Sequence, residues 1–377
     1  MQPFQIDVPD RVLEDLQRRL RATRWPDEMT GKGWKYGTDS AYLRPLCEYW
    51  ADGFDWRAQE AKLNGLDQFT AEVDGISLHF VHQKSRHKEA IPLLLSHGWP
   101  DSFWRFEKLI PLLTDPEDSA DAFHIVAPSL PGYGFSGYPS EPGWNPTRIA
   151  AAFWKLMTGA LGYKAFGAHG GDWGASITEA LAHDHPESLL GIHLTDIPFR
   201  RLFEVPPDDL SDAEKEFLQK GQAWSQTYGG YAIVQGNEPQ TLAYGLNDSP
   251  AGLAGWILDK FQKWSDCDGN LDRSFTKDEL LTNLTIYWAT GTAASASRLY
   301  FETARDETGG PKGKIEVPMG AAIFPKDLIP APREFAERIY DVRRWTEMPK
   351  GGHFAALEEP ELLAQEIQGF FRPLRTD

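Results

Sequence analysis

The chain has 377 residues, enough for one large α/β domain with an insertion or for two domains. Charged residues make up 25% of the sequence and hydrophobic residues 41%, as in ordinary soluble globular proteins. The formal net charge of −17 argues against binding to nucleic acid or to anionic membranes, because no continuous basic surface is available to meet phosphates.

The two cysteines, Cys47 and Cys267, lie in no motif and are too few for a disulfide framework, so we expect a reducing, cytoplasmic location. The N-terminus shows no basic region followed by an apolar core. No stretch approaches the roughly 18 apolar residues of a membrane-spanning helix. We therefore expect neither a signal peptide nor a membrane anchor.

Residues 1 to 75 are predicted to form a helical N-terminal segment rich in Trp and Arg. Leu13, Leu16 and Leu20 recur at helical spacing and predict a helix that ends at residue 21, with Asp10 as its N-cap. A second helix is predicted over 38–53. The chain between the two helices is expected to lie extended on a surface.

From residue 69 the pattern changes to that of an α/β core. Alternation over 68–82 predicts a hairpin around Asp74-Gly75. Short apolar runs that end in loops predict buried parallel strands at 91–96, 123–128, 163–168, 189–196, 315–324 and 342–348. Helical patterns separate them at 103–113, 146–161, 330–339 and 359–370. The alternation predicts a mostly parallel sheet with helices on both faces.

Residues 199–301 interrupt this rhythm with a long helical, Trp-rich insertion between two core strands. Its amphipathic pieces cover 212–228, 253–264 and 277–290 and predict a lid over the carboxyl ends of the strands, where such sheets hold their pocket. We therefore divide the chain into an N-terminal segment (1–75), a core (76–198 and 302–377) and the lid.

The motif Gly170-Gly171-Asp172-Trp173-Gly174 lies between an apolar run and a helical stretch. Small residues around a sharp turn between a strand and a helix are typical of a nucleophile elbow. Here Asp172 stands where many hydrolases carry serine, and its carboxylate can attack an electrophilic carbon to form an ester of the protein. The motif favours enzymes that open epoxides or displace halides. Taken alone, an Asp beside glycines is more often a turn residue.

A histidine and a second carboxylate follow in the order expected for this fold. His353 lies in a glycine-rich loop before the final predicted helix, and Asp327 follows the strand predicted at 315–324. Asp327 competes with Glu316, Asp341 and Glu347 for the role of orienting the imidazole. His169 is expected to be structural.

Two backbone N–H groups should stabilise the oxyanion of the second half-reaction. One is expected at Trp173, directly after the nucleophile, and the other at Trp99 in the loop His97-Gly98-Trp99-Pro100.

Together these motifs resemble the microsomal-type branch of the epoxide hydrolases in the α/β-hydrolase fold. The likeness rests on the HGxP motif at 97–100, the GGDWG motif at 170–174 and the histidine segment at 351–360. The N-terminal markers Thr23-Arg24-Trp25-Pro26 and Phe54-Asp55-Trp56-Arg57 extend it over nearly the whole chain. Residues 1–30 show no hydrophobic helix like that of membrane-anchored members, and we expect Asp327 to serve as the charge-relay acid where some members have Glu.

The resemblance implies that two lid tyrosines, Tyr231 and Tyr300, hydrogen-bond the epoxide oxygen. Tyr228, Tyr244 and Tyr287 lie nearby as alternatives. The expected reaction converts a small apolar epoxide and water into a vicinal diol through an ester of Asp172. It requires no metal or organic cofactor, and the family suggests a homodimer.

Three alternatives differ in their site chemistry. A haloalkane dehalogenase shares the aspartate nucleophile but holds the halide with indole N–H groups. Trp173 can supply one such group, so this alternative stays open. An ordinary esterase is disfavoured because no Gly-x-Ser-x-Gly motif occurs. A binding protein that has lost turnover should lack part of the constellation, which is complete here.

Overall fold

A nine-stranded sheet forms the centre of the computed structural model, which describes residues 1–375. The order across the sheet is β1-β2-β3-β5-β4-β6-β7-β8-β9. The strands are β1 (Gln2–Pro3), β2 (Gln68–Val73), β3 (Ile76–Gln83), β4 (Ile91–Ser96), β5 (Phe123–Pro128), β6 (Phe166–Gly170), β7 (Leu189–Leu194), β8 (Ile315–Ile323) and β9 (Tyr340–Glu347). From β5 to β9 all neighbours pair in parallel, whereas β1, β2 and β3 pair antiparallel. The predicted α/β fold is confirmed.

The hairpin of β2 and β3 turns at Asp74 and Gly75, as the alternating pattern predicts. Both residues have positive φ, 50° and 79°, which the tight two-residue turn requires and which Asp and Gly tolerate.

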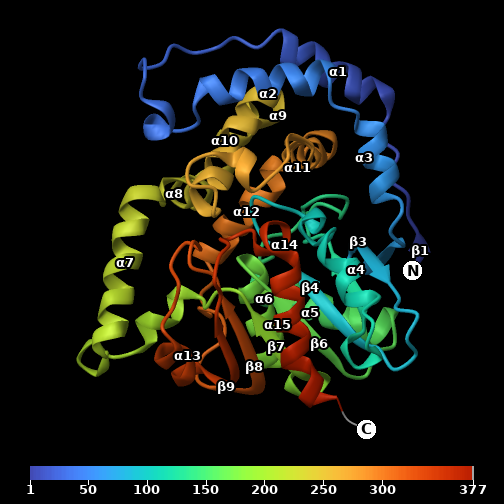
Figure 1. Cartoon of the computed structure of the whole chain (residues 1–377), viewed down its shortest axis with the longest axis vertical. Coiled ribbons are helices and arrows are strands. Elements are labelled where there is room, and N and C mark those ends of the chain that lie inside the picture. Colours follow the sequence, from blue (N-terminus) through green and yellow to red (C-terminus); the bar gives the residue numbers. More distant parts are fainter. Residues whose placement is uncertain (376–377) are drawn as a thin grey trace.

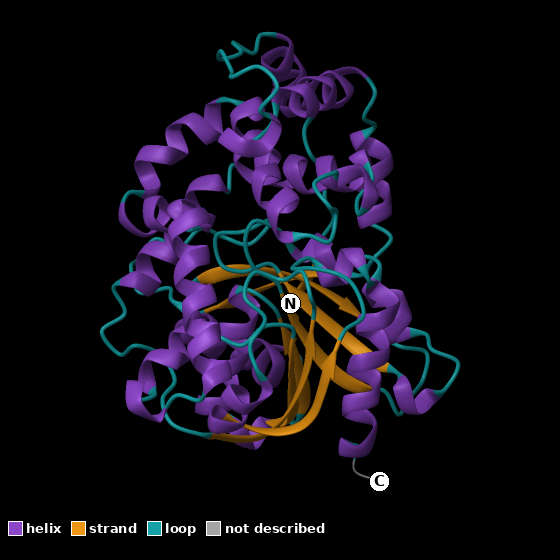
Figure 2. Ribbon diagram, turned by 60° about the vertical axis from the view of Figure 1, so that its left-hand side comes forward, coloured by secondary structure: helices purple, strands orange, loops and turns teal. Residues whose placement is uncertain are grey.

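Helices cover both faces of the sheet because its central strands are apolar on both sides. On β4, Leu93 and Leu95 pack into one hydrophobic cluster, and Leu94 points into the other. The first cluster is closed by α4 (Leu109–Thr114) and α15 (Pro360–Phe371). The second is closed by α5 (Pro146–Lys155) and α6 (Trp173–Asp184). Figure 2 shows the twisted sheet between these layers.

The insertion after β7 forms a helical layer above the sheet (Figures 1 and 2). Its helices are α7 (Asp212–Tyr228), α8 (Gly230–Asn237), α9 (Pro239–Asp248), α10 (Pro250–Trp264), α11 (Lys277–Thr290) and α12 (Ala293–Ala304). The N-terminal helices α1 (Asp10–Arg21) and α2 (Ser40–Asp52) cross this layer on the side away from the sheet, and α3 (Trp56–Leu63) leads back to the core (Figure 1). The remaining helices are α13 (Arg333–Ile339) and α14 (Ala355–Glu358).

Several predicted element boundaries were wrong for local reasons. The helix predicted over 103–113 is a 3₁₀ turn (Phe103–Phe106) followed by α4, because Pro111 has no N–H to continue a helix from that turn. The elbow strand lies at 166–170 rather than 163–168, since it pairs with β4 and β7 through Gly170. Asp10 is the first residue of α1, not its N-cap.

Among the helices of residues 1–375, none combines the length and the apolar character that a membrane-spanning segment requires.

Candidate active site

Asp172 lies at the sharp turn between β6 and α6, with φ 55° and ψ −131°. Glycines make this turn possible by allowing backbones to approach closely. A Cβ atom on Gly174 would lie 2.6 Å from the carbonyl carbon of Ser96, and one on Gly98 would lie 2.6 Å from Asp172 Cγ. The strained backbone projects the carboxylate over the carboxyl ends of the parallel strands, beneath the lid helices.

The two oxygens of Asp172 have different partners. Oδ1 accepts a hydrogen bond of 2.7 Å from the backbone N–H of Trp99, one of the two predicted oxyanion donors. Oδ2 lies 3.3 Å from Nε2 of His353. No hydrogen bond joins the Trp173 N–H to this carboxylate among residues 1–375, so the second donor stays a prediction.

The structure brings Asp327, and not its sequence competitors, to the imidazole. Oδ1 of Asp327 lies 2.7 Å from Nδ1 of His353 and also accepts a 2.6 Å bond from the N–H of Leu328. Burial by itself would lower the pKa of His353, but the carboxylates of Asp327 and Asp172 raise that pKa well above its ordinary value. The two carboxylates on either side of the ring therefore favour the charged, imidazolium form of His353.

A third carboxyl group, Asp196, enters the site from the end of β7, where sequence reasoning assigned no role. Its Oδ1 accepts a 2.7 Å bond from the backbone N–H of Asp172 and so fixes the strained turn. Burial, with the negative charges of Asp327 and Asp172, raises the pKa of Asp196 to about 8. Its place directly after a central parallel strand was the one signal that could have pointed to it.

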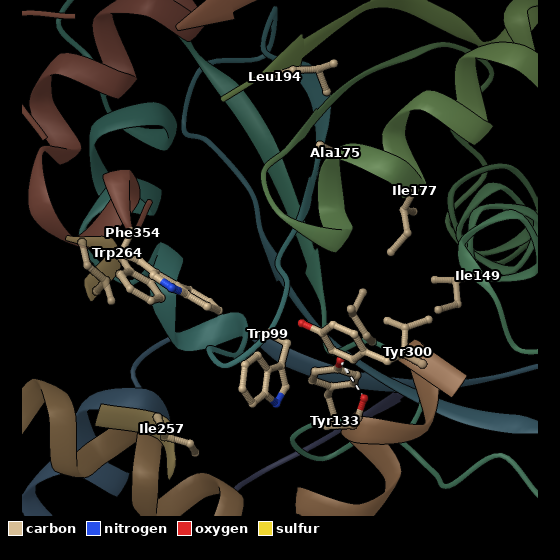
Figure 3. Packing of buried hydrophobic residues seen from close by; sticks show 14 of the residues in the cluster. Trp99, Tyr133, Ile149, Ala175, Ile177, Leu194, Ile257, Trp264, Tyr300 and Phe354 are labelled. Atoms are coloured by element: carbon tan, nitrogen blue, oxygen red, sulfur yellow. Dashed lines mark hydrogen bonds between the residues drawn. The ribbon is translucent and has the colours of Figure 1, made fainter. Parts of the chain in front are cut away.

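The predicted lid tyrosines Tyr231 and Tyr300 lie together over Trp99, and their ring centroids are 5.8 Å apart. The Tyr231 ring stacks on Trp99 at 5.1 Å, and Tyr300 meets the edges of Trp99 and Trp173 at 5.7 and 4.8 Å. Figure 3 shows Trp99 between Tyr300 and Trp264.

The side chains of Tyr231 and Tyr300 are both buried and lie close to the charge of Asp172. Burial and then the negative charge of Asp172 raise the pKa of Tyr231. The pKa of Tyr300 is raised as well, first by burial and then by the charges of Tyr231 and Asp172. Both side chains are therefore neutral phenols that can donate to an oxygen in the site.

The alternative tyrosines lie elsewhere. Tyr228 and Tyr244 are exposed, and the hydroxyl of Tyr287 donates to the carbonyl oxygen of Asp101. His169 is a structural residue, as expected: its Nδ1 lies 3.0 Å from Nδ1 of His193 in the buried core.

A buried polar network holds the loop that carries Trp99. His97 contacts the carbonyl oxygen of Gly98 through Nδ1 and accepts from the N–H of Leu130 through Nε2. Asp101 pairs at 2.8 Å with Arg105, which also donates to the backbone carbonyl of His353. Arg105 thus ties the Trp99 loop to the histidine loop.

The lid is joined to both of these loops. Asn283 of α11 donates to the carbonyl oxygen of Pro100, and Ser102 donates to Asn283. At the end of α10, the carbonyl oxygen of Trp264 accepts the N–H of His353 at 2.8 Å. Lid and catalytic loops are therefore positioned together.

The site thus combines the Asp172 carboxylate, a histidine backed by a second carboxylate, a backbone donor and two phenols. In such a site the Asp172 carboxylate can attack a strained electrophile, and the phenols can give a proton to the oxygen that leaves. The histidine can then activate water to hydrolyse the resulting ester.

Residues 1–106 match the family model described as "Epoxide hydrolase N terminus", and residues 91–240 match that of the alpha/beta hydrolase fold. A relative from Stigmatella aurantiaca is 47% identical over 99% of this chain and 85% of its own length. Epoxide hydrolase 1 of Sus scrofa is 37% identical and covers 98% of this chain and 88% of its own. The solved juvenile hormone epoxide hydrolase of Bombyx mori is 31% identical, with a TM-score of 0.86 over 99% of this chain and 94% of that one. On this likeness over nearly the full length, the chain belongs to the epoxide hydrolases of the α/β-hydrolase fold.

Proposed function

We propose that this enzyme converts an epoxide and water into a vicinal diol through a covalent ester of Asp172. The observation that carries this proposal is the pair of contacts on the carboxylate. Oδ1 is held by a backbone N–H at 2.7 Å and Oδ2 faces His353 at 3.3 Å, with Asp327 behind the imidazole.

In the first step Oδ2 of Asp172 attacks one ring carbon from the side opposite the ring oxygen. The carbon–oxygen bond breaks, and the oxygen takes a proton from the phenol of Tyr231 or Tyr300. Esterification removes the Asp172 charge, which is one of the contributions that raise the pKa of His353. His353 then releases the proton that restores the tyrosine and becomes a neutral base.

In the second step His353 removes a proton from water, and the water oxygen attacks Cγ of Asp172. The negative charge that develops on Oδ1 is stabilised by the Trp99 N–H, with Trp173 as the second predicted donor. The acyl carbon–oxygen bond breaks, and the departing oxygen takes the remaining proton of the added water. A diol leaves, and Asp172 is again a carboxylate beside a protonated His353. No step requires a metal or an organic cofactor.

An apolar substrate is supported by the rings around the site, from Trp99 and Trp173 to Trp264. The division into an N-terminal segment (1–75), a core and a lid (199–301) is part of the proposal, although α12 continues to Ala304. A cytoplasmic location and a homodimer stay predictions. The location is supported by two free, buried cysteines, Cys47 and Cys267.

The haloalkane dehalogenase alternative deserves a direct test because the indole N–H of Trp173 is buried and has no partner among residues 1–375. Purified enzyme is incubated separately with styrene oxide, 1,2-epoxyoctane, 1-bromooctane and an octanoate ester. We expect diols from the epoxides and no product from the other two, with Asp172→Asn inactive. Halide release from 1-bromooctane without diol formation would contradict the proposal.

A further inference from the structure

Helix α8 carries a buried glutamine one helical turn from Tyr231. Gln235 follows Tyr231 by four residues, so the two side chains share one face of the helix. Both are buried, whereas Ile233 on the opposite face is exposed. The Tyr231 ring stacks on Trp99, whose N–H holds Asp172. Gln235 therefore lies beside the candidate active site rather than on the outer surface of the lid.

The neighbours of the Gln235 amide identify its oxygen. Trp256 Nε1 can only donate and lies 3.2 Å from one amide atom, which must therefore be the oxygen. Ser297 Oγ lies 3.2 Å from the same oxygen. The Nε2 group is left with two N–H donors and no acceptor among residues 1–375. A buried N–H donor without an acceptor costs free energy. A bound molecule that supplies the acceptor would remove this cost.

Charged groups of α10 lie close to the rings that neighbour Gln235. On α10, the ammonium group of Lys260 lies 5.0 Å from the ring centroid of Trp256 and 5.4 Å from that of Tyr231. Asp259 forms ion pairs with both Lys260 and Lys263. Indole and ammonium groups donate hydrogen bonds and accept none, so neither Trp256 nor Lys260 can satisfy Nε2.

We propose that Gln235 Nε2 donates a hydrogen bond to an oxygen of the substrate, and that the enzyme favours epoxides with an ether, carbonyl or hydroxyl oxygen near the ring. The two residues are one helical turn apart on the same face of α8, so this oxygen should lie close to the epoxide ring. The inference rests on the proposed function, because Tyr231 defines where the epoxide oxygen is held. Gln235 is then a specificity-determining residue rather than part of the bond-breaking machinery.

A series of 1,2-epoxyalkanes of equal length tests this inference, with one methylene replaced by an ether oxygen at successive positions. kcat/KM is measured for each ether and for the parent hydrocarbon with wild type, with Gln235→Met, and with Gln226→Met on the exposed face of α7 as a control. We expect wild type to favour one ether position by about 5- to 10-fold over the others. This preference should vanish in Gln235→Met and persist in the control.

A flat series in wild type would overturn the inference without any variant. It would also be overturned if Gln235→Met lowered kcat/KM for the hydrocarbon and for every ether by the same factor, since that result indicates packing alone. Failure of wild type to open any epoxide would instead refute the proposed function, on which the inference depends.

Discussion

Replacing Asp196 with asparagine should raise the free energy of unfolding relative to wild type by an amount that grows as the pH rises from about 5 to about 8. The pKa of this carboxyl is raised from 3.8 to about 8 by burial and by the charges of Asp327 and Asp172. Between these two values the folded wild type holds a proton that the unfolded chain has lost. This group therefore opposes folding increasingly as the pH rises.

The size of the effect follows from that shift. Each pH unit adds about 1.4 kcal/mol to the difference in free energy of unfolding between variant and wild type, or at most about 4 kcal/mol from pH 5 to pH 8. The asparagine oxygen can still accept the Asp172 N–H, so the turn is kept. Above about pH 8 the difference should level off, because Asp196 is then ionised in both states.

Urea unfolding followed by Trp fluorescence measures this difference at pH 5, 6, 7 and 8. Asp208→Asn, at an exposed position, is the matched control and should show no such trend. A difference that stays constant over this range, or that falls with rising pH, would refute the view that Asp196 is protonated in the folded enzyme.

Two further sites give predictions of direction and size. Tyr300→Phe and Tyr231→Phe should each slow ester formation in a single turnover by about 10²-fold, because each loses a donor to the departing oxygen; rates within twofold of wild type would remove that role. Arg105→Leu should lower the free energy of unfolding by about 3–5 kcal/mol, because it leaves the buried Asp101 carboxylate unpaired and frees the histidine loop. Urea unfolding measures this loss, and a change below about 1 kcal/mol would show that the network is not needed.

Much of the site could be predicted because each motif occurs at a particular turn or strand end of this fold. Glycines around Asp172 mark a turn that other residues cannot form, and the chain order places His353 after its acid. The position of Asp327 after a predicted strand favours it over three competing carboxylates, and the structure places its Oδ1 2.7 Å from Nδ1 of His353. A backbone donor at Trp99 is expected from the loop after β4, and its N–H lies 2.7 Å from Oδ1 of Asp172.

The parts that were missed depend on contacts between distant segments. Asp196 resembles any residue at a strand end until β6 and β7 pair and bring it to the Asp172 N–H. The role proposed for Gln235 depends on its contact with Trp256, which belongs to another helix and donates to the amide oxygen. Likewise, α8, α9 and α12 were not predicted as separate helices, because the lid residues are buried against each other rather than along one simple apolar stripe.

Intact-protein mass spectrometry of His353→Ala with an epoxide shows whether Asp172 forms the covalent ester. Without the imidazole, Asp172 is still oriented by the Trp99 N–H, so attack should proceed while hydrolysis stalls. We expect a mass gain equal to the whole epoxide, absent in the double variant Asp172→Asn His353→Ala. A gain that persists in the double variant, or one seen only with a haloalkane and equal to its alkyl group, would contradict this expectation.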